Sequence, residues 1–553
     1  MKRFVIILIV LLSWNFRFPN DDYPDLDEIK RNLDRLASEH PDYFSFDKIA
    51  ESPGGNSVFL AKAGQGDEDL TPGLLFLSGV DGKHPAGTVM ILSLAEKILS
   101  QGGEMLDRFY FYFVPVLSPD AYAQYHDELQ YERSGNARET DIDRDGRISE
   151  DPYEDLNGDG MITQVRIEDA SGHWVTHEKD SRVLVPLKDR TKAQTIYRII
   201  SEGIDNDKDG LFNEDGPGGI NLNMNFSFDY PAFQPGAGEH AVSESENRGL
   251  AEFLFERWNI YAVFTFALEN NLSHPIGFDR QKVSRRILTG PLERDATSAQ
   301  MVASKFSDNW SIDDAPEMKQ GPGSFSSWAY FHYCRFSFVS PAWWAPVVVT
   351  ESEEEDDVEG ESEDSSAVSE KELKDNYDLR YIQWAKSEGV EDFFVDWEEI
   401  DHPDFPGRKA EVGGFKPFVR NNPPLNYLEE PAENYFSFIQ DFTNAMPTLE
   451  FQDVEVEKLE RNVFRVTGRV VNTSLLPTST QLGDRTRWVR DTRCRILLND
   501  DQELLLGHYR SFHKSLDAGE YFEFSWLVSG SGKVVLDAGS PMTGLVEFSL
   551  ELK

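Results

Sequence analysis

The chain has 553 residues, more than an ordinary single domain holds, so we expect two or three domains. Hydrophobic residues make up 39% of it, with 11 Trp and 38 Phe, which supports extended cores and confines disorder to local segments. A formal net charge of -44 repels nucleic acids and anionic membranes, so we expect neither as a partner. Cys334 and Cys494 are the only cysteines, and two cysteines predict no disulfide scaffold.

The N-terminus has the pattern of a secretory signal peptide. Residues 1–3 are a basic start, and the apolar run over residues 4–12 is too short to span a bilayer. We take residues 1–18 as the signal. An uncleaved membrane anchor is the alternative, because no small-x-small cleavage pattern precedes Pro19. No later segment predicts a transmembrane helix. The chain is therefore expected to be secreted, periplasmic or at the cell surface.

A glycine-rich turn joins a predicted strand to a predicted helix early in the chain. Residues 74–77 are an apolar run typical of a buried strand, and residues 88–99 have apolar side chains at helical spacing. Proteins of the α/β class place their chemistry in such turns, outside the carboxyl ends of strands. This turn carries Asp81 and His84, whose oxygen and nitrogen atoms are ligands that Zn²⁺ and Mn²⁺ accept. We therefore treat it as a candidate metal site.

The turn resembles the first metal-binding loop of the zinc carboxypeptidases (carboxypeptidase A-like), which reads Gly-x-His-Gly-x-Glu-x-x-Gly before a helix. The glycines match at Gly79, Gly82 and Gly87. The ligands differ, because Asp81 stands at the family's histidine and His84 at its glutamate. The resemblance implies an α/β fold, a carboxypeptidase-like mixed sheet flanked by helices, over residues 19–447. It also implies a helix over 25–40 and further core strands over 109–117 and 260–268, which the apolar pattern supports.

Later family motifs follow in order but lack key chemical groups. Residues 218–226 are similar to Gly-Val-Asp-Leu-Asn-Arg-Asn-Phe, which assigns Asn223 to the substrate's terminal carboxylate and puts Met224 at the family's arginine. A methionine cannot pair with a carboxylate. A further carboxylate-binding cation is expected from Arg133 or Arg138, near the family's other substrate arginine.

The third zinc ligand and the catalytic base also have no counterpart. In the family the third ligand is a histidine at the end of this strand, and counting back from Pro275 puts that position at Phe266 or Ala267. The strand over 260–268 contains no histidine, and Glu269 is the nearest residue with a ligating atom. The stretch 336–344, which corresponds to the strand with the family's catalytic glutamate, contains no carboxylate. We therefore expect a catalytically impaired protein that binds peptide C-termini or related peptide or protein ligands, with no catalytic residue assigned. The alternative is an active metallocarboxypeptidase in which Asp81, His84 and Glu269 form a remodelled Zn²⁺ site.

Residues 136–217 form an insertion rich in Asp, Asn and Gly, with three repeats of the type Asp-x-Asp-x-Asp-Gly. Oxygen side chains at positions one, three and five, with glycine at six, are how a short loop wraps Ca²⁺. None has the glutamate of an EF-hand at position twelve, and acidic turns without metal are the alternative. The predicted calcium ligands are Asp141, Asp143, Asp145, Asp155, Asn157, Asp159, Asp205, Asp207 and Asp209. Glu150, Asp151, Glu214 and Asp215 are expected to complete the first and third loops.

The remaining segments predict an acidic insertion and a second domain. Residues 351–375 begin with a run of Asp and Glu and are expected to be a disordered surface insertion. Closing helices are expected over 377–394 and 431–446, with a loop between them. Residues 448–553 alternate apolar and polar side chains in short runs between turns, which predicts an antiparallel β-sandwich. A third hypothesis is a calcium-dependent adhesive surface module built from the Asp-rich loops and this sandwich.

Overall fold

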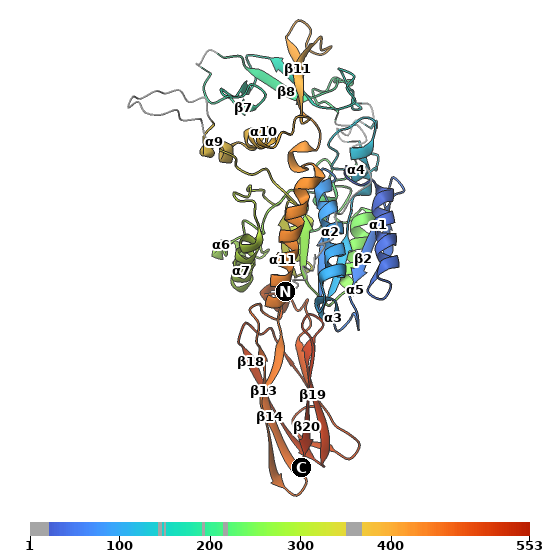
Figure 1. The fold of residues 1–553 in the computed structure, drawn as a ribbon, viewed down its shortest axis with the longest axis vertical. Coiled ribbons are helices and arrows are strands. Elements are labelled where there is room, and N and C mark those ends of the chain that lie inside the picture. Colours follow the sequence, from blue (N-terminus) through green and yellow to red (C-terminus); the bar gives the residue numbers. More distant parts are fainter. Residues whose placement is uncertain (1–21, 142–145, 149–150, 191–193, 214–218, 350–367) are drawn as a thin grey trace, which may run out of the picture.

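The computed structural model describes residues 22–141, 146–148, 151–190, 194–213, 219–349 and 368–553. The predicted signal peptide over 1–18 lies outside these residues. Figure 1 shows an elongated molecule with a helix-covered sheet at its centre, a smaller sheet at one end and a β-sandwich at the other. No helix in the described part of the chain has the length and apolarity that crossing a membrane requires.

The central sheet has six strands, and its four core strands run parallel. In spatial order they are β1 (Phe44–Glu51), β2 (Ser57–Ala63), β4 (Tyr110–Val114), β3 (Gly73–Leu77), β9 (Ile260–Phe266) and β10 (Phe336–Ser340). Every residue of β3, β4 and β9 is buried, as expected for parallel strands covered on both faces. The predicted strands at 74–77, 109–117 and 260–268 are confirmed, with their ends moved by a few residues.

Helices cover both faces of this sheet. The helices described before the β-sandwich are α1 (Leu26–Glu39), α2 (Pro85–Gln101), α3 (Met105–Arg108), α4 (Pro119–Ala123), α5 (Ser245–Glu256), α6 (Arg280–Val283), α7 (Glu293–Asn309), α8 (Phe325–Phe331), α9 (Glu370–Asp375), α10 (Tyr377–Glu388) and α11 (Glu429–Ala445). Short 3-10 turns are η1 (Gln124–His126), η2 (Leu222–Met224), η3 (Val419–Asn421) and η4 (Leu425–Leu428). On one face α1, α2, α7, α10 and α11 pack against aromatic side chains such as Phe76 and Phe264, whose rings stack at 5.4 Å. On the other face α5 and α8 pack against Leu75 and Val263.

The Asp-rich insertion folds into a second sheet with a hairpin from much later in the chain. Its strands, in spatial order, are β11 (Phe394–Ile400), β12 (Ala410–Phe415), β5 (Gln164–Glu168), β8 (Tyr197–Ser201), β6 (Trp174–Thr176) and β7 (Leu184–Pro186). We expected a loop between the two closing helices, and that expectation is wrong because β11 and β12 lie there. Val165 and Ile167 of β5 bury a small core with Ala410 and Val412 of β12. Neither segment covers its apolar side chains alone.

The predicted disordered insertion over 351–375 needs a partial correction. Residues 351–367 lie outside the described part of the chain, whereas residues 370–375 form α9. Ser369 and Glu372 make a reciprocal capping box at its start, and Leu373 is buried. Lys179 of the Asp-rich insertion bonds Glu372 at 2.8 Å. These contacts order the end of an otherwise strongly acidic stretch.

The predicted C-terminal β-sandwich is confirmed, with two antiparallel sheets of four strands. One sheet has the order β13 (Leu449–Glu460), β14 (Val463–Asn472), β18 (Tyr521–Ser529) and β16 (Glu503–Leu506). The other has β17 (Arg510–His513), β15 (Thr492–Leu497), β19 (Gly532–Ser540) and β20 (Gly544–Leu552). A short helix, α12 (Gln481–Thr486), joins the two domains: its first backbone N–H groups donate to Asp295 of α7 at 2.6 and 3.0 Å. Cys334 and Cys494 are both buried and free.

Candidate functional site

The glycine-rich turn lies at the carboxyl end of β3, where two of its glycines are needed for space. Gly79 has φ of +63°, and a Cβ there would meet the Val116 backbone at 2.8 Å. A Cβ on Gly87 would lie 2.4 Å from Oγ of Ser78 and 2.8 Å from Cβ of Phe266. These glycines therefore allow the turn to pack against β9 and the segment after β4. Their match to the family pattern is therefore explained by packing and does not indicate catalytic activity.

His84 of this turn makes its hydrogen bond to the main chain. Its Nε2 accepts the N–H of Ala342 at 3.0 Å, and the side chain is 1% exposed. Ala342 follows β10 in the stretch where the family carries its catalytic glutamate. Burial lowers the pKa of His84 to about 4, so the imidazole is neutral. Because Nε2 accepts this hydrogen bond, the neutral ring carries its proton on Nδ1.

Asp81 and Glu269 are carboxylates with raised pKa values at the ends of neighbouring strands. Burial raises the pKa of Asp81, while Lys83 opposes that shift, and Oδ1 accepts the N–H of Lys83 at 3.2 Å. Glu269 lies just beyond β9 and is 4% exposed. Burial raises its pKa to about 7, against the hydrogen bonds it accepts, and the charge of Asp81 adds to the rise. The charge of Asp81 therefore acts on the carboxyl group of Glu269.

The two oxygens of Glu269 are both hydrogen-bonded by protein groups. Oε1 accepts from Nδ2 of Asn223 at 3.0 Å, and Oε2 accepts from Oγ of Ser326 at 2.5 Å. The amide oxygen of Asn223 in turn accepts the N–H of Phe325 at 3.0 Å. The structure thus brings together a predicted metal ligand and a predicted substrate-binding residue. Each is a hydrogen-bond partner of the other.

The donor atoms at this site do not match what a zinc ion requires. A zinc site of this type takes three protein ligands and keeps one open position. Of all the His, Cys, Asp and Glu groups in the described ranges, only Asp205, Asp207 and Asp209 bring three ligand atoms within 4.8 Å of one another. Asp81, His84 and Glu269 do not form such a group. With Nε2 of His84 directed at a main-chain N–H, the residues present do not fit the metal.

The expected third-ligand position is occupied by core side chains. Phe266, the last residue of β9, packs its ring against Tyr435 of α11 at 4.7 Å. Ala267 is buried in the cluster on the opposite face of the sheet. Neither side chain carries an atom that binds a metal, so this strand end serves packing.

The two candidate cations for a substrate carboxylate differ in how they are held. The guanidinium of Arg133 is buried and donates to the carbonyl oxygens of Gly135 and Asn136. Arg138 donates from Nε to Oε2 of Glu244 at 2.9 Å, and its side chain is 44% exposed. Arg138 is therefore the cation with surface left for a ligand.

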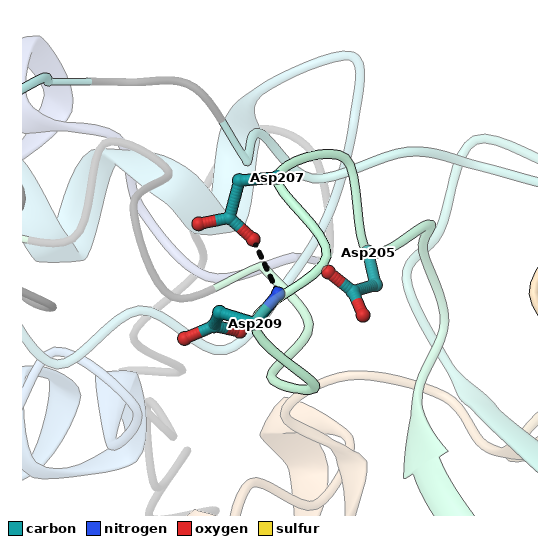
Figure 2. Close-up of side chains that lie close together, drawn as sticks. All are labelled: Asp205, Asp207 and Asp209. Carbon is teal, nitrogen blue, oxygen red and sulfur yellow. Dashed lines mark hydrogen bonds between the residues drawn. The ribbon is translucent and has the colours of Figure 1, made fainter.

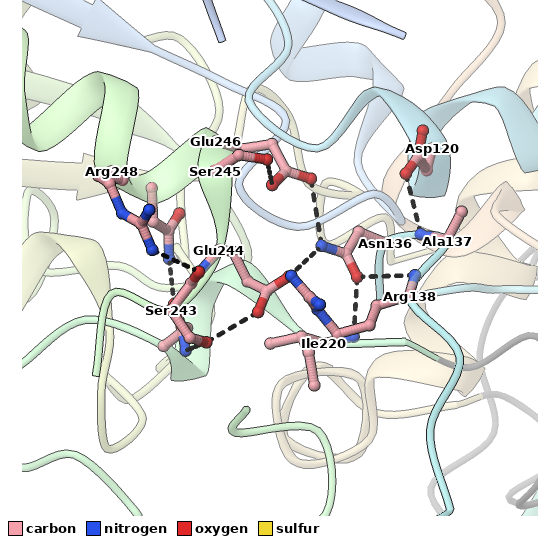
Figure 3. Close-up of polar contacts among 12 residues, drawn as sticks. Asp120, Asn136, Ala137, Arg138, Ile220, Ser243, Glu244, Ser245, Glu246 and Arg248 are labelled. Carbon is pink, nitrogen blue, oxygen red and sulfur yellow. Dashed lines mark hydrogen bonds and ion pairs between the residues drawn. The ribbon is translucent and has the colours of Figure 1, made fainter. Parts of the chain in front are cut away.

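Figure 3 shows the polar network that anchors Arg138. Nδ2 of Asn136 donates to the buried carboxylates of Glu244 and Glu246 at 2.8 and 3.2 Å. Its Oδ1 accepts the N–H groups of Arg138 and Ile220 at 3.2 and 3.0 Å. Burial raises the pKa of Glu246, and its hydrogen bonds oppose that shift. One asparagine therefore links the start of α5 to the beginning of the Asp-rich insertion and to the segment just after its end.

Two residues that brace the site carry no sequence signal. Asn422 accepts the N–H of Ala86 at 3.0 Å and donates from Nδ2 to the carbonyl of Lys83 at 2.9 Å, so it holds both sides of His84. It lies 336 positions beyond Ala86, too far for any local pattern. Ser326, which bonds Glu269, lies in a serine-rich stretch that reads only as a helix start. Such contacts appear only once the chain is folded.

The predicted calcium ligands are placed in part. Asp143, Asp145, Glu150, Glu214 and Asp215 lie outside the described residues. Asp141 accepts the N–H of Gly146 at 3.0 Å. The second loop, with Asp155, Asn157 and Asp159, and the third, with Asp205, Asp207 and Asp209, are both described. Asp151 accepts the N–H groups of Asn206 and Asn213 at 3.0 and 2.8 Å.

Comparison with known proteins assigns the two main domains. Residues 29–341, more than half of the chain, match the model of the zinc carboxypeptidase family, and residues 448–551 match a domain of unknown function. Carboxypeptidase B of Astacus astacus is 28% identical over 104 residues. That match covers 18% of this chain and only 34% of the relative, about a third of its length.

Solved structures give weaker likenesses. The carboxypeptidase A of Helicoverpa armigera is 13% identical, with 67% of this chain and 74% of that chain covered and a TM-score of 0.36. Bovine thrombin-activatable fibrinolysis inhibitor, solved with tick carboxypeptidase inhibitor, is 14% identical, with 67% and 98% covered and a TM-score of 0.34. The assignment rests on the family match and not on these superpositions. The chain belongs to the zinc carboxypeptidase family.

Proposed function

We propose that this protein is a binding member of the zinc carboxypeptidase family that does not hydrolyse peptides. The observation that carries the proposal is the hydrogen bond from the N–H of Ala342 to Nε2 of His84. This bond uses the Nε2 lone pair of His84, the one histidine among the candidate site residues, and a metal would need that lone pair. A neutral imidazole used in this way is a buried structural group and not a metal ligand.

The chemistry of hydrolysis supports the same conclusion. A metallocarboxypeptidase needs three ligands, a metal-bound water, a base near that water and a cation for the substrate's carboxylate. Phe266 and Ala267 stand where the third ligand is expected, and the stretch after β10 has no carboxylate. Glu269 is held by Asn223 and Ser326 rather than facing an open metal position. Loss of a general base alone typically lowers a rate by about 10²–10⁴-fold.

The proposed ligand is a peptide or protein with a free C-terminal carboxylate. Arg138 is the half-exposed cation that supports this choice, because its Nε bond to Glu244 fixes the guanidinium and leaves 44% of the side chain exposed. Asn223, the other predicted contact, already donates its amide to Glu269. We therefore assign the carboxylate contact mainly to Arg138.

Two further parts of the proposal concern location and calcium. Residues 1–18 are proposed to direct export, so that the protein acts outside the cytoplasm. The Asp-rich insertion is proposed to bind Ca²⁺, because its repeated acidic loops carry oxygen ligands at the spacing this ion uses. Both parts are independent of whether the site around Arg138 binds a peptide.

A titration of the full chain with paired peptides tests the proposal. One peptide has a free C-terminal carboxylate and the other is the same sequence with a C-terminal amide. We expect the free acid to bind more tightly, and Arg138→Ala to remove that preference. Arg248→Ala is the matched control, because Arg248 is an exposed arginine of the same network whose guanidinium donates to the carbonyl oxygen of Ser243 and not to a carboxylate. Equal binding of both peptides would contradict the carboxylate contact, and shortening of the free acid would contradict the loss of hydrolysis.

A further inference from the structure

We infer that the third Asp-rich loop, residues 205–210, is a preformed Ca²⁺ site, and that the second loop, residues 155–160, is not. The inference rests on the proposed calcium-binding role of the insertion and is independent of peptide binding. Ligand atoms of Asp205, Asp207 and Asp209 lie within 4.8 Å of one another. Figure 2 shows the three carboxylates arranged around one side of the loop. Proximity of acidic groups alone would not identify a site, so the partners of each oxygen matter.

Asp205 has a buried oxygen that lacks a hydrogen-bond donor. The residue is 8% exposed, and its Oδ2 accepts the N–H of Gly210 at 3.1 Å. Its Oδ1 is buried and has no hydrogen-bond partner within the described ranges. A buried carboxylate oxygen without a partner costs free energy, because its hydrogen bonds to water are lost and no protein donor replaces them. Its carboxylate faces the space beside Asp207 and Asp209, so a cation held there would be its partner (Figure 2).

The other two carboxylates are oriented by the loop itself. Oδ1 of Asp207 accepts the N–H of Asp209 at 3.0 Å, and Oδ1 of Asp209 accepts the N–H of Leu211 at 2.6 Å. Each bond fixes one oxygen of a carboxylate and so sets the direction of the second. Burial falls from Asp205 through Asp207 to the exposed Asp209. The ring of three carboxylates is therefore closed at Asp205 and open to solvent at Asp209, where an ion can enter.

The second loop has the same turn but satisfies its own oxygens. Asp155, at position one, accepts from Gly158 and Asp159 with Oδ1 and from Gly160 with Oδ2. At position three, Asn157 donates its amide to Oδ2 of Asp159 at 3.1 Å. This loop therefore carries one carboxylate fewer and uses more of its oxygens internally. The contrast at position one, between Asp155 and Asp205, sets the two loops apart.

Residues outside the loop hold its backbone in place. Oδ2 of Asp404 accepts the N–H of Asp205 at 3.0 Å, and Oδ1 of Asp404 pairs with Nζ of Lys208. Asp151 accepts both the N–H and the side-chain amide of Asn206 at 3.0 Å. Nζ of Lys208 also donates to the carbonyl oxygen of Asp205, so it ties the loop backbone to Asp404. A frame built before the ion arrives reduces the ordering that binding must impose.

The donor set selects a hard divalent cation. All ring ligands are carboxylate oxygens on a short loop, which suits the six to eight oxygens and adaptable geometry of Ca²⁺ better than the strict octahedron of Mg²⁺. Gly216 stands at position twelve, where an EF-hand has its bidentate glutamate. We therefore expect a dissociation constant of about 10⁻⁴–10⁻³ M, as in extracellular calcium modules.

Calcium titration of the full chain after treatment with a chelator tests the site. We expect the wild type to bind one Ca²⁺ through the third loop, with Asp205→Asn weakening that affinity on the order of tenfold or more. Asp155→Asn, the same change at position one of the second loop, is the matched control and should leave the affinity unchanged. Asp205→Asn keeps an oxygen for the N–H of Gly210, so the turn is preserved. Asp209→Asn, at the exposed end of the ring, is a second variant should the first fail to fold.

The outcomes separate the site from the broader calcium proposal. Binding that is lost in Asp155→Asn but kept in Asp205→Asn would overturn the assignment to the third loop and leave a calcium-binding insertion. The absence of calcium binding by the wild type would overturn both. Thermal unfolding of both proteins, without and with added calcium, gives a second check. Without calcium, Asp205→Asn should melt no lower than the wild type, because it removes one of three like charges, whereas added calcium should raise the melting temperature of the wild type alone.

Discussion

Nδ2 of Asn223 donates a hydrogen bond to Oε1 of Glu269 at 3.0 Å. In the sequence these residues suggest different roles, one as a contact for the substrate and one as a metal ligand. In the fold each is the other's hydrogen-bond partner, and the hydroxyl of Ser326 donates to the second oxygen of Glu269. A buried carboxylate held by neutral donors is a group with a displaced pKa, and that displacement is measurable.

Glu269 should make the protein less stable as the pH rises from about 4.5 to about 7. Burial raises its pKa to about 7, so the folded chain holds a proton that the unfolded chain releases near its ordinary value of 4.5. The contribution is fully present below pH 4.5 and is lost as the pH rises through 7. A displacement of this size corresponds to about 3 kcal/mol at most. Chemical unfolding across this range should show a smaller loss for Glu269→Gln than for the wild type.

The exposed Glu256 supplies the control for that measurement. Glu256→Gln should leave the pH profile unchanged, because its side chain lies in water on α5. An identical slope in the wild type and in Glu269→Gln would show that Glu269 ionises normally. The account of its buried, doubly bonded carboxylate would then be wrong.

His84 should act in the opposite direction at lower pH. Burial lowers its pKa to about 4 from the ordinary 6.5, so the unfolded chain takes up a proton that the folded chain refuses. The stability it contributes is present above pH 6.5 and is lost as the pH falls through 4. NMR titration of the imidazole should find it neutral at pH 6. A midpoint near 6.5 would contradict the buried contact with Ala342.

Asn422 is predicted to stabilise the turn that carries His84. Asn422→Ala removes the acceptor for the N–H of Ala86 and the donor to Lys83, and leaves buried main-chain groups without partners. We expect a loss of about 1–3 kcal/mol in the free energy of unfolding. Asn434→Ala is the control, because Asn434 bonds Ser311 on the exposed side of α11. Equal effects of the two substitutions would show that the turn does not depend on Asn422.

The sequence was informative where a local pattern has one structural solution. Apolar runs such as residues 74–77 predict buried strands, and the glycines that include Gly79 predict the turn that follows. The second sheet escaped prediction, because its short strands in the insertion are completed by β11 and β12 from more than two hundred residues later. The site residues were found by their chemical type, but their partners were not. The residues near Glu269 in the sequence do not predict that Asn223 and Ser326 are its partners.

The same limit applies to the acidic loops. Three similar repeats predict three similar calcium loops, since spacing alone does not reveal which oxygens the protein uses itself. The distinction between Asp155 and Asp205 depends on burial and on hydrogen bonds. Asp151, expected to help complete a calcium loop, accepts the N–H groups of Asn206 and Asn213, which no local pattern indicates.

The measurement that tests the central claim most directly is the release of C-terminal amino acids from peptides by the full chain, supplied with Zn²⁺. The wild type and His84→Ala are compared under the same conditions, with bound zinc measured in both. We predict no release above background for either protein and no stoichiometric bound zinc. Zinc-dependent release by the wild type that His84→Ala abolishes would contradict the account, since it would make His84 a ligand of a working enzyme.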